Sequence, residues 1–290
     1  MRDVKSRTIP LLLVFFTALA LSGASPAISA DCKATYGKSD KVFRLATGSP
    51  GELGLLEALA DAFNPAHDTA MCWVKAGSGK SLKLLHQKKV DAVMVHAPAA
   101  EKKAVAEGWA IKRSLIGSNE FYIVGPENDP AGIASAGSAA EAYARIAKAR
   151  APFLSRGDNS GTHKKERGIW KTANVDPKGG WYIITKDFMM ATLKQANAAN
   201  GYFMTDSSTW VAGRKDLGNL KVLFRGDPVL INTYHGLCQP ENATPVQPAA
   251  AAFIEFLGSD KGQAIIRDYG NARYGAAMYN DAEYARKYDH

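Results

Sequence analysis

Hydrophobic and polar positions follow two alternating patterns along the chain. Short, nearly continuous apolar runs, typical of buried strands, are followed by segments in which apolar residues recur every three or four positions, typical of helices. The first such pair is an apolar run at 41–47 and a periodic segment at about 52–63. Because strands that alternate with helices pair mostly in parallel, the pattern predicts an α/β fold.

The same pattern continues almost to the C-terminus. Further strands are predicted at 71–76, 91–96, 120–126, 181–184, 202–205, 221–224 and 232–238. Further helices are predicted directly after the strands at 71–76 and 91–96, and at 139–149, 163–172, 189–199, 249–257 and 260–269. The segment after Gly270 is expected to be irregular.

Two of these strands are candidates for crossings between lobes. The strand at 120–126 ends in a Gly-Pro pair, and the strand at 232–238 can return the chain. We therefore expect two lobes, each a mostly parallel sheet flanked by helices. Lobe 1 is assigned residues 31–125 and 233–290, and lobe 2 is assigned residues 126–232.

The first 30 residues have the pattern of a secretory signal peptide. Arg2, Lys5 and Arg7 precede an apolar run at 9–21, and small residues follow as far as Ala30. The apolar run is short for a membrane span. We expect cleavage near Ala30 and export of the mature protein.

Charge and cysteine content limit the kinds of ligand that the protein is expected to bind. The formal net charge is +8, without a long run of Lys and Arg interleaved with aromatic residues, which suits a small anion better than a nucleic acid. The three cysteines fit no metal-binding spacing and the six histidines are scattered, so no metal or cofactor is expected. Export permits one disulfide, and the positions of Cys32 before the first strand and Cys72 at the start of the second favour that pair.

The segment at 155–166, Ser-Arg-Gly-Asp-Asn-Ser-Gly-Thr-His-Lys-Lys-Glu, is the strongest candidate for binding chemistry. A glycine-punctuated loop runs into a helix that Ser160 or Thr162 can cap. The start of a helix has unpaired N–H donors and partial positive charge, and Arg156 adds a planar set of donors suited to oxyanions. The segment predicts a cradle for a small tetrahedral oxyanion, and an ordinary capped loop with Arg156 paired to Asp158 is the alternative.

Two earlier turns have a similar composition. Thr47-Gly48-Ser49 lies between the first strand and its helix, and Gly77-Ser78-Gly79 lies between the second strand and its helix. Ligands of α/β sheets bind at the carboxyl ends of strands, so these hydroxyls are candidate ligands, with plain strand-to-helix turns as the alternative. The second turn also resembles a Walker A loop, but Val74 stands where that motif needs its first glycine, which argues against a nucleotide.

The function classes differ in what they require of these residues. Two lobes that close on a ligand need no covalent chemistry. An enzyme needs an activated nucleophile or an acid–base pair, but Ser160 and His163 lie within one helical turn and lack an evident third member. We therefore disfavour an enzyme, and a secreted structural protein without a ligand is the remaining alternative.

Four segments of the chain resemble segments of a known protein family: 95–103, 122–126, 155–166 and 181–183. Together they resemble the substrate-binding proteins of tungstate ABC transporters, a branch of the two-lobe periplasmic binding proteins, over nearly the whole mature chain. The resemblance implies a monomeric periplasmic receptor that hands tungstate or molybdate to a permease in the inner membrane. The loop at 156–162 also resembles the oxyanion loop of phosphate-binding proteins, so phosphate is a rival ligand.

The chain departs from that family at its turns. The turn Thr47-Gly48-Ser49 is shorter than the family's Thr-Thr-Thr-Ser run, Ser78 replaces a threonine, and 186–190 is bulkier than the family's glycine-rich turn. Asp158 bears on the choice of anion, because a carboxylate can accept the proton of hydrogen phosphate but repels a fully ionised oxyanion. If Asp158 instead pairs with Arg156 or caps the helix, tungstate is favoured. The predicted ligand-binding residues are Thr47, Gly48, Ser49, Ser78, Ser155, Arg156, Asp158, Ser160, Gly161 and Thr162.

Overall fold

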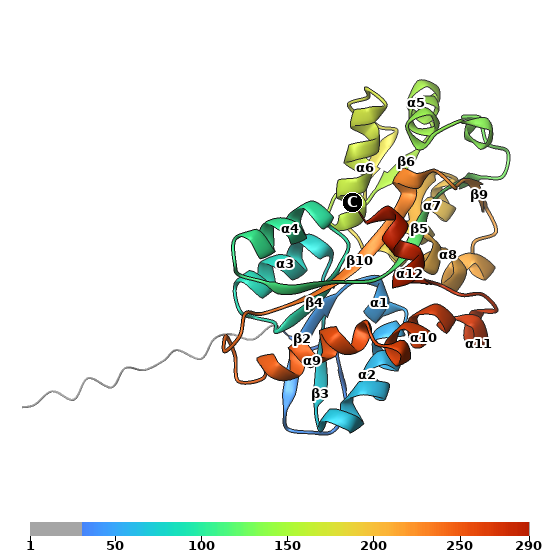
Figure 1. Ribbon diagram of the computed structural model, residues 1–290. Helices are drawn as coiled ribbons and strands as arrows, with labels where there is room; N and C mark the ends of the chain where they lie inside the picture. The colour runs from blue at the N-terminus through green and yellow to red at the C-terminus, as the bar shows by residue number, and fades with distance from the viewer. Residues whose placement is uncertain (1–30, 290) are drawn as a thin grey trace, which may run out of the picture.

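The computed structural model describes residues 31–289. The signal peptide predicted at 1–30 lies outside the described residues. Strands and helices alternate through most of the described chain, which confirms the α/β class (Figure 1). None of the helices within 31–289 has the length and apolarity needed to cross a bilayer.

The predicted elements occur in the predicted order, but β1, β6 and the first part of β5 were not predicted. The strands are β1 (Ala34–Tyr36), β2 (Val42–Thr47), β3 (Ala70–Lys75), β4 (Ala92–Val95), β5 (Ile111–Pro126), β6 (Phe153–Ser155), β7 (Tyr182–Ile184), β8 (Tyr202–Asp206), β9 (Leu220–Phe224), β10 (Ile231–Cys238) and β11 (Asn280–Asp281). The helices are α1 (Ser49–Glu52), α2 (Leu55–His67), α3 (Ser78–His86), α4 (Pro98–Ala106), α5 (Ala139–Ala149), α6 (Gly161–Thr172), α7 (Met189–Ala199), α8 (Ser207–Gly213), α9 (Gln247–Leu257), α10 (Asp260–Asp268), α11 (Asn271–Tyr274) and α12 (Ala282–Ala285).

The strands form one curved path of hydrogen-bonded neighbours, β1-β3-β2-β4-β10-β5-β8-β6-β7, with β9 and β11 also paired to β5. Parallel pairs lie at the centre of each half: β2 with β3 and β4, and β6 with β7 and β8. Antiparallel pairing joins β10 to β4 and β5, and β5 to β8. The sheets are therefore mixed, with parallel pairs where the alternation of strand and helix is regular.

Strand β5 extends through both halves of the molecule, beside β10 (Figure 1). Its first part, as far as Glu120, pairs with β10, and its second part, from Phe121, pairs with β8 and β9. At the change of partners the Asn232 Nδ2 atom donates to Asn119 Oδ1 at 2.8 Å. The lobe limits at 125 and 232 stay a prediction.

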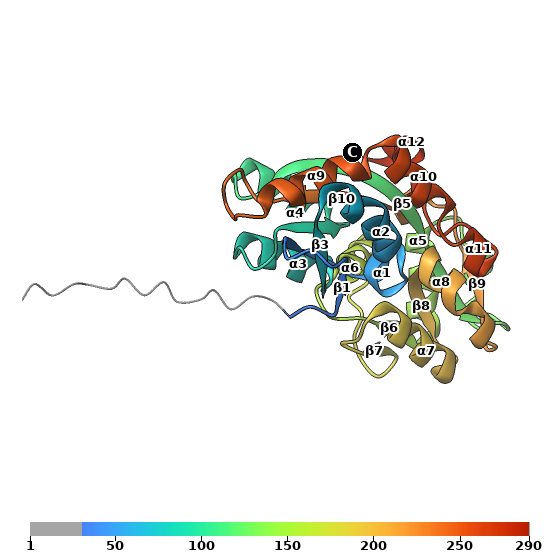
Figure 2. The same ribbon diagram turned by 90° about the horizontal axis from the view of Figure 1, so that it is seen from below.

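Each half has its own hydrophobic core. In the first half, Phe43, Phe63 and Phe253 pack with ring centroids 5.2–6.1 Å apart. Residues of α2 and α9 belong to this cluster, and residues of α3 and α4 belong to a second cluster that includes Val74 and Val95. Figure 2 shows these four helices in the same half of the molecule as β3. In the other half, Trp170 and its aromatic neighbours form a separate core. Separate cores allow each half to move as a unit about the strands that join them.

Two sequence expectations outside the site are settled by the structure. Cys32 and Cys72 form a disulfide, which confirms that pairing, and Cys238 is a buried free thiol. The expectation of an irregular tail after Gly270 was wrong, because α11, β11 and α12 follow and Asn280 pairs with Ser118 of β5. The tail thus adds a strand to β5.

Candidate functional site

A small cavity lies where turns from both halves meet. It is lined by Gly48, Ser49, Pro50, Gly77, Ser78, Met94, His96, Arg156, Ser160 and Tyr234. All three strand-to-helix turns that were predicted to bind the ligand, at 47–49, 77–79 and 155–166, contribute residues to this lining. The space open to the centre of a water molecule is only about 10 Å³, so the two halves enclose the site closely.

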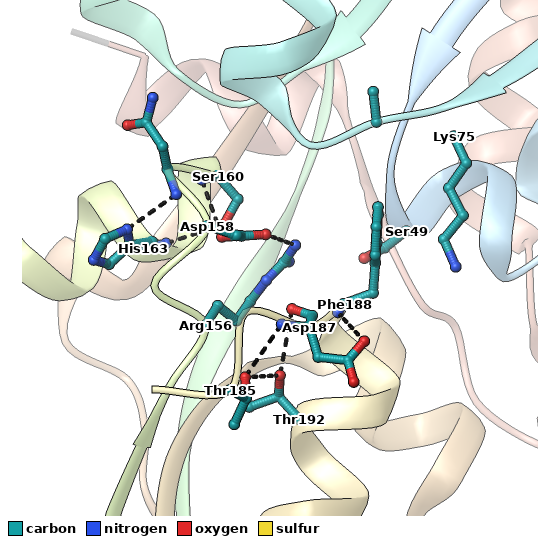
Figure 3. Close-up of polar contacts among 12 residues, drawn as sticks. Ser49, Lys75, Arg156, Asp158, Ser160, His163, Thr185, Asp187, Phe188 and Thr192 are labelled. Carbon is teal, nitrogen blue, oxygen red and sulfur yellow. Dashed lines mark hydrogen bonds and ion pairs between the residues drawn. The ribbon is translucent and has the colours of Figure 1, made fainter. Parts of the chain in front are cut away.

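The loop before α6 is organised by Asp158. Ser160 is the N-cap of α6 and accepts a hydrogen bond from the His163 amide. Asp158 accepts from the Ser160 amide at 3.1 Å through one oxygen and from Arg156 Nη2 at 2.5 Å through the other (Figure 3). Burial acts to raise the pKa of Asp158, but the Arg156 charge and the Ser160 hydrogen bonds outweigh it and hold that pKa below its ordinary value. Asp158 is therefore an ionised partner of Arg156 inside the loop.

Two buried polar atoms beside this loop make no hydrogen bond within the described chain: Arg156 Nε and Thr162 Oγ1. Arg156 is only 4% exposed and Thr162 only 1%. An unsatisfied buried donor costs about 1–3 kcal/mol, so a folded protein rarely retains one without a use. The start of α6 adds backbone N–H groups that no preceding turn can satisfy. Together these donors are what a bound oxyanion would saturate.

The turns of the first half place their hydroxyls differently. Thr47 Oγ1 donates to the Met94 carbonyl at 2.9 Å, so this hydroxyl joins β2 to β4 and does not line the cavity. Ser49 opens α1, and its hydroxyl lies 3.4 Å from Asp206 Oδ2 of the other half. Ser78 lines the cavity, and its Oγ accepts from the His96 amide at 3.1 Å.

Glycines allow the two halves to approach closely at the cavity. A methyl group at Gly77 would lie 3.1 Å from Cβ of Ser160, and one at Gly79 would lie 2.8 Å from the Asn159 carbonyl oxygen. A side chain at either position would therefore separate the turn after β3 from the loop before α6. The structure thus has the two halves in contact across the site.

Glu166 anchors the start of the loop before α6 to the hydrophobic core. Its carboxylate accepts from Ser155 Oγ at 2.8 Å, from the Tyr182 hydroxyl at 2.6 Å and from Trp170 Nε1 at 3.2 Å. The Ser155 hydroxyl is thereby directed into the core. Burial raises the pKa of Glu166 to about 7, against the opposing effect of those hydrogen bonds.

The structure therefore divides the predicted residues into two groups. Those that line the cavity are Gly48, Ser49, Ser78, Arg156 and Ser160. Those that are not part of this lining are Thr47, Ser155, Asp158, Gly161 and Thr162, of which Thr162 holds an unpaired buried hydroxyl. Their assignment as ligand-binding residues stays a prediction.

Sequence reasoning did not place four residues in the site: His96, Asp206, Lys75 and Phe188. The His96 ring lies against Gly161, and its Nδ1 is 2.8 Å from Asn232 Oδ1. Burial lowers the pKa of His96 to about 4, so the ring is neutral at neutral pH. Asp206 ends β8 and caps α8, and this strand-to-helix position is the sequence feature that could have identified it.

No metal centre is formed in the part of the chain that the structure describes. Nowhere in 31–289 are three or more His, Cys, Asp or Glu side chains placed to hold a metal ion. The arrangement is one of hydrogen-bond donors around a small space, which suits binding of an anion.

Comparison with known proteins finds relatives that are binding proteins or ABC transporter proteins. Residues 33–261 match the PBP superfamily domain. The tungstate-binding protein TupA of Peptoclostridium acidaminophilum is 31% identical over 279 residues, which are 92% of this chain and 94% of that protein. A putative ABC transporter anion-binding protein of Haloferax volcanii is 34% identical over 245 residues, 80% of this chain and 70% of that protein. The crystal structure of the tungstate ABC transporter from Geobacter sulfurreducens matches with a TM-score of 0.72 and 37% identity, over 80% of this chain and all of that one.

Proposed function

The chain belongs to the PBP superfamily of binding proteins, and we propose that it is the receptor of an ABC importer that captures tungstate or molybdate between its two halves. Proteins named as tungstate-binding or tungstate-transport proteins match most of this chain. The proposal is supported by the predicted leader and by a site built of hydrogen-bond donors.

The observation that carries the proposal is the pair of unpaired buried donors, Arg156 Nε and Thr162 Oγ1, beside the start of α6. A dianion transferred out of water must have its oxygens saturated by donors, because unpaired buried charge is very unfavourable. The guanidinium lies in the loop before α6, and the hydroxyl and the free N–H groups belong to the first turn of that helix. Ser49 and Ser78 on the opposite half add hydroxyls at the same cavity.

Asp158 favours a fully deprotonated oxyanion over hydrogen phosphate. Both of its oxygens already accept hydrogen bonds, one from Arg156 and one from Ser160, and its pKa is lowered. It is therefore committed to organising the loop and is poorly placed to take up the proton of hydrogen phosphate. Tungstate and molybdate carry no proton at neutral pH and need no such acceptor.

The remaining parts of the proposal follow from the family. We infer that the mature protein works in the periplasm as a monomer and delivers its anion to a permease in the inner membrane. No reaction is required of any side chain in the site, since capture and release need only lobe motion.

The test is calorimetric titration of the chain without its predicted leader with tungstate, molybdate, sulfate and hydrogen phosphate. We expect tight binding of tungstate and molybdate and weak binding of hydrogen phosphate. Arg156→Ala should weaken tungstate binding by at least ~1.5 kcal/mol, the lower end for a hydrogen bond to a charged group. Arg167→Ala is the matched control, because Arg167 is an exposed arginine of α6, the helix that follows the Arg156 loop. Preference for hydrogen phosphate, or no heat with any oxyanion, would overturn the proposal.

A further inference from the structure

The ring of Phe188 lies between a cation of each half of the molecule. Lys75 Nζ lies 4.2 Å from the ring centroid, and Arg156 Cζ lies 5.4 Å from the same centroid. Figure 3 shows Phe188 between these two side chains, beside Ser49. Both distances are within the range in which a cation is attracted to an aromatic face.

The two cations belong to different elements of the site. Arg156 lies in the loop before α6 and holds one of the unpaired donors. Lys75 ends β3, directly before the turn that contains Gly77 and Ser78, and its Nζ also contacts Glu52 at 3.0 Å. The Arg156 contact lies within one half, while the Lys75 contact spans the two halves.

Phenylalanine is an unusual residue at a helix N-cap, the position that Phe188 occupies in α7. It is the N-cap of α7, where Ser, Thr, Asp or Asn would accept a hydrogen bond from the first turn, and it makes no side-chain cap. Asp187 stands one residue earlier and bonds the Phe188 amide instead. A residue that breaks a local rule indicates a role beyond the helix itself.

We propose that Phe188 is a positioning residue of the anion site, which holds the Arg156 guanidinium in place and joins the halves through Lys75 when they close. This inference rests on the proposed function. The Lys75 contact requires the halves to be in contact, so it stabilises the closed state and slows release of the anion. The Arg156 contact restricts the guanidinium whether or not an anion is bound.

The experiment is a set of variants of the chain without its predicted leader, titrated with tungstate and followed by dissociation kinetics. Phe188→Leu keeps an apolar side chain and removes the aromatic face, and we expect a five- to tenfold weaker affinity, mainly through faster dissociation. Phe188→Trp keeps an aromatic face and should retain wild-type affinity within about twofold. Tyr284→Leu is the matched control, because Lys287 lies 5.5 Å from that exposed ring and neither residue is part of the cavity lining.

A double-mutant cycle separates this contact from the long-range charge of Lys75. Lys75→Gln should weaken tungstate binding about threefold in the wild-type background and have no effect in Phe188→Leu. An equal effect of Lys75→Gln in both backgrounds, or wild-type affinity in Phe188→Leu, would overturn the inference. Absence of oxyanion binding by the wild-type chain would overturn the proposed function itself, so the two failures are distinguishable. A melting temperature of Phe188→Leu close to the wild type confirms that the variant is folded.

Discussion

At the scale of single residues, the site is defined by atoms that lack partners. Thr47 and Ser155 have hydroxyls like that of Thr162, but theirs donate to Met94 O and to Glu166, respectively. The Thr162 hydroxyl is equally buried and has no partner in the described chain. Of these three hydroxyls, Thr162 is therefore the one left available to an anion.

We expect Thr162→Val to change stability and affinity in opposite directions. Valine has a similar shape and removes the unpaired hydroxyl, so the free energy of unfolding without ligand should rise by about 1 kcal/mol. Tungstate affinity should fall about fivefold, because one hydrogen bond to the anion is lost. Chemical denaturation and calorimetry measure the two quantities.

Thr172→Val provides the comparison for this prediction. The Thr172 hydroxyl is exposed at the end of the same helix and donates to Gly168 O at 3.1 Å. The Thr172→Val variant should leave tungstate affinity unchanged. If Thr162→Val likewise leaves affinity unchanged, its hydroxyl does not bind the anion.

At the scale of elements, the strands that could be predicted from the sequence are those whose own residues show a clear hydrophobic pattern. The four residues of β4 are all apolar and all buried, so the predicted strand at 91–96 was correct to within a residue at each end. The first part of β5, from Ile111, was missed because it is half polar and its strand character comes from β10, which lies more than 100 residues away.

The site shows the same limit. Arg156, Ser160 and Ser78, which line the cavity, were predicted as ligand-binding residues because strand-to-helix turns rich in glycine and hydroxyls can be recognised from local sequence. Phe188 and Lys75 were missed because their relation is a contact between halves, which no local pattern specifies. The bulky segment at 186–190 was noted only as a departure from the related family, and the structure places the Phe188 ring beside Arg156.

Helix α6 also supports a prediction on pH. Burial raises the pKa of Glu166 to about 7, so the folded protein binds this proton more tightly than the unfolded chain. The stabilising contribution is fully present below the ordinary glutamate pKa and is lost as the pH rises through 7. Between those pH values the loss is on the order of 3 kcal/mol.

Glu166→Gln isolates this contribution from other titrating groups. The variant cannot ionise, so the difference in unfolding free energy between Glu166→Gln and the wild type should shift by roughly that amount between pH 4.5 and 8. Urea unfolding at a series of pH values measures it. A constant difference across this range would show that Glu166 titrates normally in the folded protein.

At the scale of the whole molecule, two halves with separate cores are joined by β5 and β10, and they meet over a cavity with little free space. Ser160 approaches Gly77, Ser49 approaches Asp206, and Phe188 contacts Lys75. All three contacts join one half to the other, and they leave little space for an anion between the halves. The structure therefore represents the closed arrangement, and binding requires an open one.

We expect the unliganded chain in solution to be more open than this structure. Its radius of gyration from small-angle X-ray scattering should exceed the value calculated for residues 31–289 and should fall when saturating tungstate is added. Chloride at the same ionic strength should leave it unchanged, which separates specific closure from screening of the positive net charge. If both forms scatter as the closed structure does, the halves do not open appreciably in solution. The anion would then have to reach Arg156 through side-chain motion alone, and the coupling of closure to binding would be wrong.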